Sequence, residues 1–349
     1  MSDHDLFQRI ISLENIFAGW REFKKGKDRK VDIREFEFNL EDNLFALHSD
    51  LNNKTYLPAA YSSFYINDPK LRHIHKASVR DRVLHQALFR VLDGIFDKKF
   101  IYDSYSCRVN KGTHKGVARL YDFMRKASKN FRVRKYALKC DIRKFFDNID
   151  HTILVKLIER TITDPDTLWL LKMIINSFCK EAGRGLPLGN VTSQLFSNIY
   201  LNELDRFVKH ELKEKYYLRY CDDFIILGDD ENHLRELVLE MGNFLRENLS
   251  LGIHPNKIII RKFKQGIDFL GYVILPHYIV MRTKTKRRIL KRTKFLGEKL
   301  KNGLISDEKH NAVLQSYLGA LKHCRGYKIS KQIEFSTSLF FYLGLNNTQ

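Results

Sequence analysis

The chain has 349 residues and is strongly basic, with 61 Lys and Arg against 41 Asp and Glu and a formal net charge of +20. Such an excess favours a polyanionic partner, with nucleic acid first and an anionic membrane surface second. No apolar run is long enough to span a bilayer, and acids precede the first apolar residues, so we expect a cytoplasmic protein without membrane contact. The five cysteines are scattered without a CxxC pair, which argues against a zinc site or a disulfide framework.

Residues 1–64 are predicted to form packed helices, because apolar residues recur there at helical spacing and no motif with chemistry is evident. Basic and apolar residues then alternate through a short strand or hairpin that contains Arg72 and Lys76. An amphipathic helix is expected to start near Ser78. Arg72 and Lys76 are candidates to contact a triphosphate, although a solvated basic face explains them nearly as well.

A basic turn containing Arg108 and Lys111 precedes Gly112 and Thr113 at the expected start of the next helix. Backbone N–H groups at a helix N-terminus attract anions, so this turn is a candidate phosphate site. The motif is weak when it is taken alone.

The next short strand has the sequence YALKCDI and places Asp141 near its end. Asp150 follows as the expected N-cap of a helix with periodic apolar residues. An ionised carboxylate at the end of a buried strand is costly without a cation or hydrogen bonds, which makes Asp141 a candidate metal ligand.

A glycine-rich loop, GRGLPLGN, lies between Asp141 and a long helix that Asn190 or Thr192 is expected to cap. Because glycine lets the backbone approach a ligand closely, the loop around Gly189 is a candidate contact. Gln194 lies in the first turns of the helix, on the side where a substrate would sit. The rest of the helix shows a core stripe and is expected to be structural.

Asp222 and Asp223 interrupt an apolar stretch, YLRY-CDD-FIIL, that is typical of a β-hairpin with the acids at its tip. A solvated acidic turn is the alternative, and the later pair Asp229-Asp230, which lies beyond the apolar strand, is such a turn. If the strand that ends near Asp141 lies beside this hairpin, three carboxylates converge. Three carboxylates are enough to hold two magnesium ions about 3.5–4 Å apart for nucleotidyl transfer.

The C-terminal part is predicted to contain an amphipathic helix ended by Gly252, then strands over 258–260 and 269–273. Residues 282–301 are the densest basic run and combine one apolar stripe with a basic remainder, which suits the phosphates of a nucleic-acid duplex. A second helix is expected from Ser306 and would pack against the first. Charge runs of this kind are often only solvated faces.

Eight blocks in this order resemble the successive motifs of a prokaryotic reverse transcriptase of the group II intron-like superfamily over residues 65–325. They read VRDRVLHQAL, SYSCRVNKGTH, KCDIRKFFDNIDH, GLPLGNVTSQLFSNIYLNELD, RYCDDFIIL, LGIHPNKIII, DFLGYVI and SYLGALKH. Ser193-Gln194, the KGTH block and the compact length resemble the reverse transcriptases of diversity-generating retroelements.

The resemblance implies an α+β right-hand polymerase with fingers, a palm of antiparallel sheet plus helices, and a small helical thumb. Residues 65–275 would form the fingers and palm, residues 1–64 would pack on the fingers, and residues 276–349 would form the basic thumb. The activity implied is RNA-directed DNA synthesis with two Mg²⁺ ions, for which Mn²⁺ substitutes. Implied partners are an RNA template, the RNA/DNA hybrid and dNTPs, with a structured noncoding RNA and a helical oligomeric accessory protein as further candidates.

Asp141, Asp222 and Asp223 match the catalytic triad of the family, with the Ile142 carbonyl as an additional metal ligand. Phe146 matches the bulky residue that excludes a 2′-hydroxyl, with a core aromatic as the alternative. The implied nucleotide contacts are Arg72, Lys76, Phe145, Phe146, Leu188, Gly189, Gln194 and Lys257. The implied nucleic-acid contacts are Arg108, Lys111, Arg287, Arg288, Lys291 and Arg292.

Leu188 departs from the family, because many relatives have glutamine between the proline and the glycine of this loop. An aliphatic residue there removes a hydrogen bond to the incoming nucleotide, so we expect elevated misincorporation, particularly opposite template adenine. Two alternatives stay open. One is a related reverse transcriptase used in antiphage defence, which makes DNA from its own noncoding RNA or without a template, and the other is a noncatalytic RNA-binding module. In each case the protein would be prokaryotic or phage-encoded.

Overall fold

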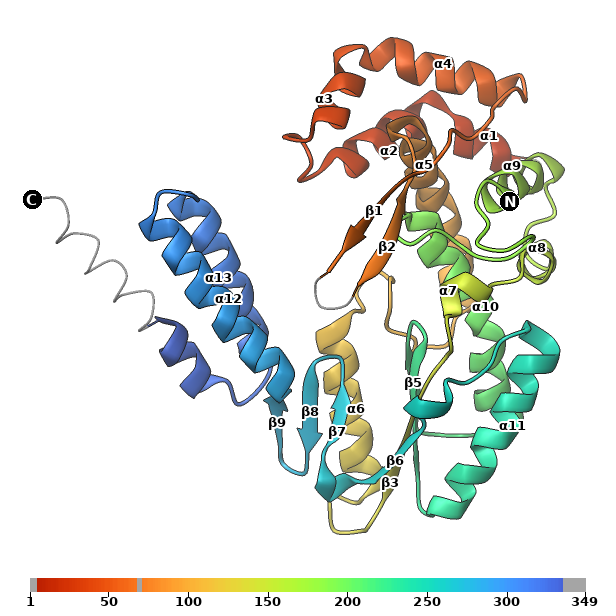
Figure 1. Ribbon diagram of the computed structural model, residues 1–349. Helices are drawn as coiled ribbons and strands as arrows, with labels where there is room; N and C mark the ends of the chain where they lie inside the picture. The colour runs from red at the N-terminus through yellow and green to blue at the C-terminus, as the bar shows by residue number, and fades with distance from the viewer. Residues whose placement is uncertain (1–4, 68–70, 335–349) are drawn as a thin grey trace, which may run out of the picture. The chain divides into compact units, whose positions relative to one another are not determined.

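The computed structural model describes residues 5–67 and 71–334 and forms two compact units (Figure 1). The first unit comprises residues 1–110, 140–224 and 235–258. The second comprises residues 111–139, 225–234 and 259–349. The division into fingers, palm and thumb that the sequence suggests stays a prediction.

The chain begins with four helices that pack around a longer one. Their bounds are α1 (Leu6–Ile11), α2 (Leu13–Lys24), α3 (Val31–Phe38), α4 (Leu40–Asn52) and α5 (Val79–Phe96). Ser12 separates the first two helices, and its hydroxyl accepts the Asn15 N–H to cap α2. Helix α2 lies so close to α5 that a Cβ atom at Gly19 would stand 3.1 Å from the Ala87 nitrogen. A side chain at position 19 would require the two helices to shift by a few tenths of an ångström, so the contact favours glycine there.

An antiparallel hairpin of β1 (Ser62–Ile66) and β2 (Arg72–Lys76) precedes α5, with Ser62 opposite Lys76. The helix start predicted near Ser78 is confirmed, and the Ser78 hydroxyl caps α5 by accepting the Asp81 N–H. The hairpin therefore presents Arg72 and Lys76 from a strand. The strand predicted around these two residues is confirmed.

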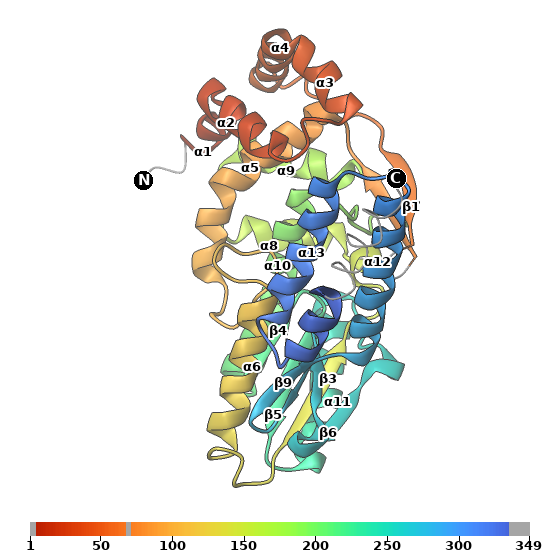
Figure 2. The same cartoon turned by 90° about the vertical axis from the view of Figure 1, so that its left-hand side faces the viewer.

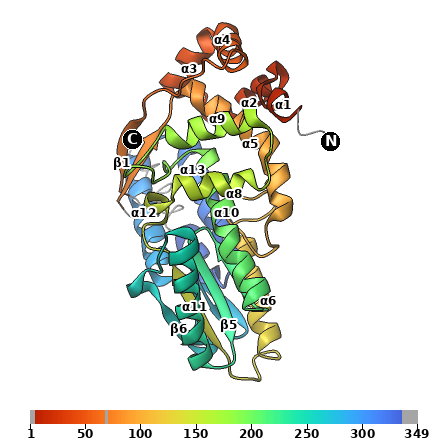
Figure 3. The ribbon, with the colours of Figure 1, turned by 90° about the vertical axis from the view of Figure 1, so that its right-hand side faces the viewer.

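The first unit also contains four further helices, of which the last is the longest. These are α7 (Phe145–Asn148), α8 (His151–Glu159), α9 (Pro165–Asn176) and α10 (Val191–Arg206), followed by a π-helical turn over Phe207–Glu211. Helix α8 packs on both α9 and α10 (Figure 3). Asp150 caps α8 by accepting two backbone N–H groups, which confirms the predicted cap. Helix α10 buries residues on most of its sides and forms the centre of this unit.

A four-stranded sheet contains the segments in which the sequence places the candidate acids. Its strands, in spatial order, are β4 (Tyr217–Tyr220), β5 (Asp223–Gly228), β3 (Tyr136–Asp141) and β6 (Ile259–Lys262). β3 pairs with β6 antiparallel, with Tyr136 opposite Lys262. β3 and β5 each run from one unit into the other. The predicted α+β class with antiparallel sheet is confirmed, as a polymerase palm requires.

The second unit adds helix α6, a small antiparallel sheet and a helical pair. Their bounds are α6 (Thr113–Ala127), β7 (Ile267–Phe269), β8 (Tyr272–Leu275), β9 (Tyr278–Met281), α12 (Thr283–Lys301) and α13 (Asp307–Leu321). Helices α12 and α13 pack side by side (Figure 2). Ser306 caps α13 as expected, because its hydroxyl accepts the Lys309 N–H.

Two local predictions are wrong. The single strand expected over 269–273 is broken by a turn, because Leu270 and Gly271 both have positive φ, at 50° and 88°. Helix α11 (Glu231–Leu249) ends at a left-handed Ser250 with φ 50°, before Gly252. None of the helices in the described part of the chain combines the length and the apolar character needed to cross a membrane.

A buried ion pair links β4 to α10 within the first unit. Arg219 and Asp205 are both fully buried, and the guanidinium donates two hydrogen bonds to the carboxylate, at 2.7 and 2.6 Å. The Tyr217 hydroxyl donates to the same carboxylate at 2.7 Å. Burial and this negative charge raise the pKa of Tyr217 well above its usual value. Both formal charges are therefore matched inside the core.

Replacing one partner of this pair is expected to destabilise the protein strongly. In Asp205→Leu the Arg219 charge stays buried without a counter-ion, and the free energy of unfolding should fall by about 3–5 kcal/mol. Urea denaturation at neutral pH measures the loss. The double variant Asp205→Leu/Arg219→Met removes both charges and should lose clearly less. Equal losses in the single and double variants would contradict the assignment.

Candidate active site

A buried arginine holds the backbone of the acidic turn between β4 and β5 by hydrogen bonds. Cys221 has a left-handed backbone, with φ 54°, and starts the turn that presents Asp222 and Asp223. The Arg219 Nη1 group donates to the Cys221 carbonyl at 3.1 Å and to the Asn198 side-chain oxygen at 3.3 Å. The guanidinium that pairs with α10 thus also holds the backbone of the turn.

Asp141 is the last residue of β3 and is 8% exposed. The next residue, Ile142, donates its N–H to the Asp222 carbonyl at 3.2 Å. On the other side, the Asp141 carbonyl accepts the His254 N–H at 2.8 Å. Backbone hydrogen bonds therefore place Asp141 beside the turn that bears Asp222.

The charges in this cluster repel one another. Burial raises the pKa of Asp222, and the negative charges of Asp141 and Asp223 raise it further. Lys257, which ends the short 3-10 turn Pro255–Lys257, places its Nζ 2.5 Å from Asp141 Oδ1. The lysine is the expected candidate for contact with a leaving pyrophosphate, and in this structure it pairs with a candidate catalytic acid.

The donor atoms of the cluster suit a hard divalent cation, because carboxylate and carbonyl oxygens are the ligands that Mg²⁺ prefers. A bound cation would also reduce the repulsion between Asp222 and the negative charges of Asp141 and Asp223. Among the described residues, no group of three or more His, Cys, Asp and Glu side chains is gathered closely enough to hold a metal ion. A metal site at Asp141, Ile142, Asp222 and Asp223 is therefore a proposal that rests on donor chemistry.

The glycine-rich loop is attached to the segment after Asp141. The Leu186 N–H donates to the Phe146 carbonyl at 2.8 Å. Gly189 has φ 118°, and a Cβ atom there would lie 3.5 Å from the Ile74 side chain of β2. Leu188 is half-buried. The loop thus lies close to the hairpin that bears the candidate triphosphate contacts.

Phe145 and Phe146 differ in exposure. Their rings contact edge to face, with centroids 5.2 Å apart. Phe145 is 2% exposed and belongs to the core, whereas Phe146 is half-buried. The nucleotide contact expected of Phe145 is therefore blocked by burial. Of the two rings, Phe146 has the accessible surface, and its contact with a nucleotide stays a prediction.

The other residues expected to contact a nucleotide, Arg72, Lys76 and Gln194, differ in exposure and in bonding partners. Lys76 pairs with Asp32 at 2.8 Å, and Arg82 pairs with the same carboxylate at 2.6 Å. Arg72 is exposed on the hairpin. Gln194 is half-buried near the start of α10, and its carbonyl accepts the Ser197 hydroxyl. Of the two basic candidates on β2, Arg72 is the more accessible.

Arg108 has a structural role in this fold. Its side chain is 5% exposed, pairs with Asp97 and donates to the Ile101 and Ser104 carbonyls at 2.7 and 3.1 Å. These bonds use the donors that a phosphate would need, and they favour a structural role over the phosphate contact expected from the sequence.

The candidate nucleic-acid contacts of the second unit lie on or before helices. Lys111 is half-buried just before α6. On α12, Ile289 and Leu296 are buried, and the basic positions between and before them are exposed. The exposed candidates are Arg287, Arg288, Lys291 and Arg292. The amphipathic helix predicted here is confirmed, whereas its contacts with nucleic acid stay predictions.

The sequence motifs did not reveal the residues that support the acidic turn. Arg219, Asp205 and Asn198 connect α10 to the turn through the bonds described above. All three lie inside the sequence blocks that resemble the family, but those blocks do not indicate that these residues contact one another. One signal was present: Arg219 is a charged residue inside the otherwise apolar strand YLRY. A charge in a buried strand requires a partner.

Comparison with known proteins shows the family of the chain. A family model described as "Reverse transcriptase (RNA-dependent DNA polymerase)" matches residues 67–274, more than half of the chain. The chain belongs to the reverse transcriptase family. The match includes all three candidate catalytic carboxylates, the glycine-rich loop and Lys257.

Curated relatives of this reverse transcriptase include proteins of group II introns. The group II intron-encoded protein LtrA of Lactococcus lactis is 28% identical over 305 residues, covering 67% of the chain and 50% of LtrA. Protein YkfC of Escherichia coli is 25% identical over 286 residues, covering 70% of the chain and 74% of YkfC. The putative COX1/OXI3 intron 2 protein of Saccharomyces cerevisiae is 22% identical, and the chain spans only 30% of its length.

Among solved structures, telomerase from Candida albicans in complex with a telomeric RNA fragment is similar, with a TM-score of 0.49 and 13% identity. The alignment covers 83% of the chain and 61% of that telomerase.

The backbone of Gly189 provides a test of the loop geometry. A φ of 118° is rarely adopted by residues with a side chain, so Gly189→Ala should lower the free energy of unfolding by about 1–3 kcal/mol. Gly242, inside α11, has open space around a Cβ atom, so Gly242→Ala should raise stability by about 0.5–1 kcal/mol. Urea denaturation compares the two variants. A Gly189→Ala variant as stable as the wild type would show that the loop is not held in this conformation.

Proposed function

We propose that this reverse transcriptase acts as an RNA-directed DNA polymerase, with Asp141, Asp222 and Asp223 as its catalytic carboxylates. The proposal is supported by the backbone hydrogen bond from Ile142 to the Asp222 carbonyl, which holds the end of β3 beside the hairpin turn. It is also supported by the charges of Asp141 and Asp223, which both raise the pKa of Asp222. A solvated acidic turn would not need a buried arginine to hold it. The neighbouring pair, Asp229-Asp230, lacks such support from Arg219.

The reaction would join the primer 3′-oxygen to the α-phosphorus of a dNTP while the bond to pyrophosphate breaks. The three carboxylates and the Ile142 carbonyl would hold two Mg²⁺ ions, or Mn²⁺ in their place. Bound ions of this kind lower the pKa of the attacking hydroxyl and stabilise the charge on the pyrophosphate. Lys257 would move from Asp141 to the leaving group, because a lysine side chain is flexible and strongly attracted to phosphate.

The other candidates would position the nucleotide and the nucleic acid. Phe146 would lie against the sugar and exclude a 2′-hydroxyl, with Leu188 and Gly189 beside the base pair. Gln194, Arg72 and, less directly, Lys76 would complete the nucleotide contacts. The exposed basic face of α12 would bind the phosphates of an RNA/DNA hybrid, which proteins recognise by backbone and shape.

Removal of the paired acids tests the proposal. Asp222→Asn/Asp223→Asn should reduce dNTP incorporation on a primed RNA template by at least about a hundredfold, because the charge that would bind the ions is removed. Asp229→Asn/Asp230→Asn is the matched control, since this pair lies at the exposed end of the same strand, and it should stay close to wild type. Equal activity of the two variants would contradict the assignment.

A wild-type protein that incorporates no nucleotide, even with any structured RNA and accessory protein found to be encoded beside it, would favour the noncatalytic RNA-binding alternative. Activity that requires that RNA would instead favour a reverse transcriptase dedicated to its own noncoding RNA, as in antiphage defence.

We further propose that the polymerase is of the diversity-generating type and misincorporates opposite template adenine. The support is the pattern of Ser193-Gln194, the KGTH block and Leu188 in the loop. Leu188 is half-buried and offers no hydrogen bond to the base pair or the sugar, so selection would depend on shape.

Restoring an amide tests this hypothesis. Leu188→Gln should lower misincorporation opposite adenine relative to wild type, because the amide supplies the missing hydrogen bond. Steady-state incorporation of each dNTP on a defined RNA template measures the ratio, and Leu188→Met, which keeps an apolar side chain of similar volume, is the control. Unchanged error rates in Leu188→Gln would remove Leu188 from the explanation.

A further inference from the structure

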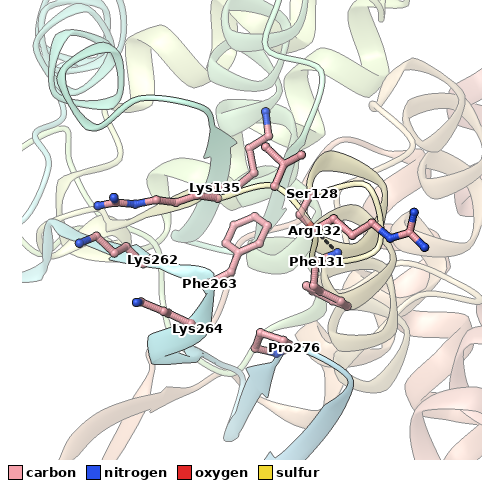
Figure 4. Close-up of a pocket in the computed structure, with 10 residues that line it drawn as sticks. Ser128, Phe131, Arg132, Lys135, Lys262, Phe263, Lys264 and Pro276 are labelled. Carbon is pink, nitrogen blue, oxygen red and sulfur yellow. Dashed lines mark hydrogen bonds between the residues drawn. The ribbon is translucent and has the colours of Figure 1, made fainter.

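A basic pocket lies in the second unit, apart from the candidate catalytic carboxylates. Its volume is about 250 Å³, and it is lined by the end of the α6–β3 loop, by residues that follow β6 and by Pro276 (Figure 4). Its lining includes five cationic side chains: Arg132, Arg134, Lys135, Lys262 and Lys264. Lys135 directly precedes β3, whose other end bears Asp141.

The positive charge of the pocket is only partly neutralised. Lys135 pairs with Asp229, whose side chain is 82% exposed. Arg134 stacks over the Tyr136 ring at 5.3 Å, which leaves its guanidinium charge unneutralised. In the described part of the chain, Arg132, Lys262 and Lys264 form no ion pair. Cations gathered without counter-ions repel one another, so an anionic ligand would stabilise this arrangement.

The loop that forms one wall is conformationally strained. Lys129, Asn130 and Phe131 are consecutive non-glycine residues with left-handed backbones, at φ 50°, 59° and 64°. This conformation brings Cβ close to the following carbonyl oxygen, so it is unfavourable for each residue that carries a side chain. Strain of this kind persists where the surroundings enforce it, and it is concentrated at functional sites.

Buried Ser128 is the anchor that enforces this conformation. Its hydroxyl donates to the Met124 carbonyl at 2.6 Å and accepts the Phe131 N–H at 2.8 Å. The Phe131 ring contacts the His277 ring edge to face, with centroids 5.0 Å apart. The loop therefore holds Phe131 and the following Arg132 in fixed positions at the pocket.

Aromatic and basic groups alternate around the pocket. Phe263 is buried in its wall, and Phe131 is half-buried. Figure 4 shows Lys262 and Lys264 on one side of Phe263 and Arg132 on the other. Cations on both sides of aromatic rings suit a nucleic-acid strand whose phosphates contact the cations. A base of that strand would then stack on the half-buried ring of Phe131.

We propose that this pocket binds a single-stranded segment of RNA. Guanidinium groups bind phosphate oxygens with paired hydrogen bonds, and aromatic rings stack on unpaired bases. A cavity of this volume accommodates a nucleotide and is too small for a duplex. An acidic peptide would match the charge, but it supplies no base to stack on the exposed part of the Phe131 ring. The inference does not require that the protein polymerise DNA.

Two RNA/DNA hybrids test the site: one nearly blunt and one with a long single-stranded RNA extension. Fluorescence anisotropy measures the affinity of each over a range of salt concentrations. In the wild type the extension should tighten binding. In Arg132→Ala/Arg134→Ala/Lys264→Ala the gain in affinity that the extension gives should fall by at least about tenfold. The slope of the logarithm of the binding constant against the logarithm of the salt concentration should also become shallower. The change should be about 0.7 for each RNA phosphate that the variant no longer neutralises.

Matched variants separate the local effect from net charge. Lys98→Ala/Lys213→Ala/Lys215→Ala removes the same charge from exposed positions of the first unit and should keep the gain. Arg132→Lys/Arg134→Lys keeps the charge and should retain most of the salt dependence. A pocket variant that keeps the full gain from the extension, or a control that loses as much, would overturn the proposal.

Folding and the polymerase proposal are checked separately. The pocket variant should bind the blunt hybrid as the wild type does and should unfold at the same urea concentration. A wild type without dNTP incorporation that still gains affinity from the extension would contradict the polymerase proposal and leave the RNA site standing. If instead the wild type incorporates dNTPs on the nearly blunt hybrid but the extension gives no gain in affinity, the polymerase proposal stands and the RNA site is contradicted.

Discussion

The ion pair between Arg219 and Asp205 is the constraint on which the candidate active site depends. Moving two charges from water into the core costs several kcal/mol for each ion, and only excellent geometry offsets that cost. Here the guanidinium makes two short hydrogen bonds to the Asp205 carboxylate through Nε and Nη2. Its Nη1 group donates to the Cys221 carbonyl and to the Asn198 side-chain oxygen. One buried side chain therefore connects the central helix, a buried strand and the turn that presents the acids.

This support explains how like charges are kept together. Asp222 lies near two other negative charges, and burial disfavours its ionised form as well. A flexible turn would separate such groups, but backbone bonds from Ile142 and His254 and the left-handed Cys221 fix the two segments. A site that holds carboxylates against their repulsion suits the binding of divalent cations, and its rigidity limits the reorganisation needed during reaction.

Local signals in the sequence were sufficient for much of the fold. Asp150 was identified as a helix cap, and helix starts were placed near Ser78 and at Ser306, because a capping side chain acts on residues two or three positions away. The cap expected at Asn190 or Thr192 is not formed, because α10 has no side-chain hydrogen bond at its N-cap, Asn190. The hairpin at Asp222 followed from the two apolar strands beside it. Long-range partners were not predictable in this way: the sequence does not show that Arg219 meets Asp205, or that Arg108 meets Asp97. The turn at Leu270 was missed because an apolar residue gives no signal of a left-handed backbone.

The central claim is that Asp141, Asp222 and Asp223 form one metal-binding centre. Its most direct test is anomalous diffraction from crystals grown with an RNA/DNA hybrid, a non-hydrolysable dNTP analogue and Mn²⁺. The account predicts manganese bonded to oxygens of all three aspartates and to the triphosphate. Manganese bound to the triphosphate elsewhere, or an ordered nucleotide with no manganese at these carboxylates, would contradict it.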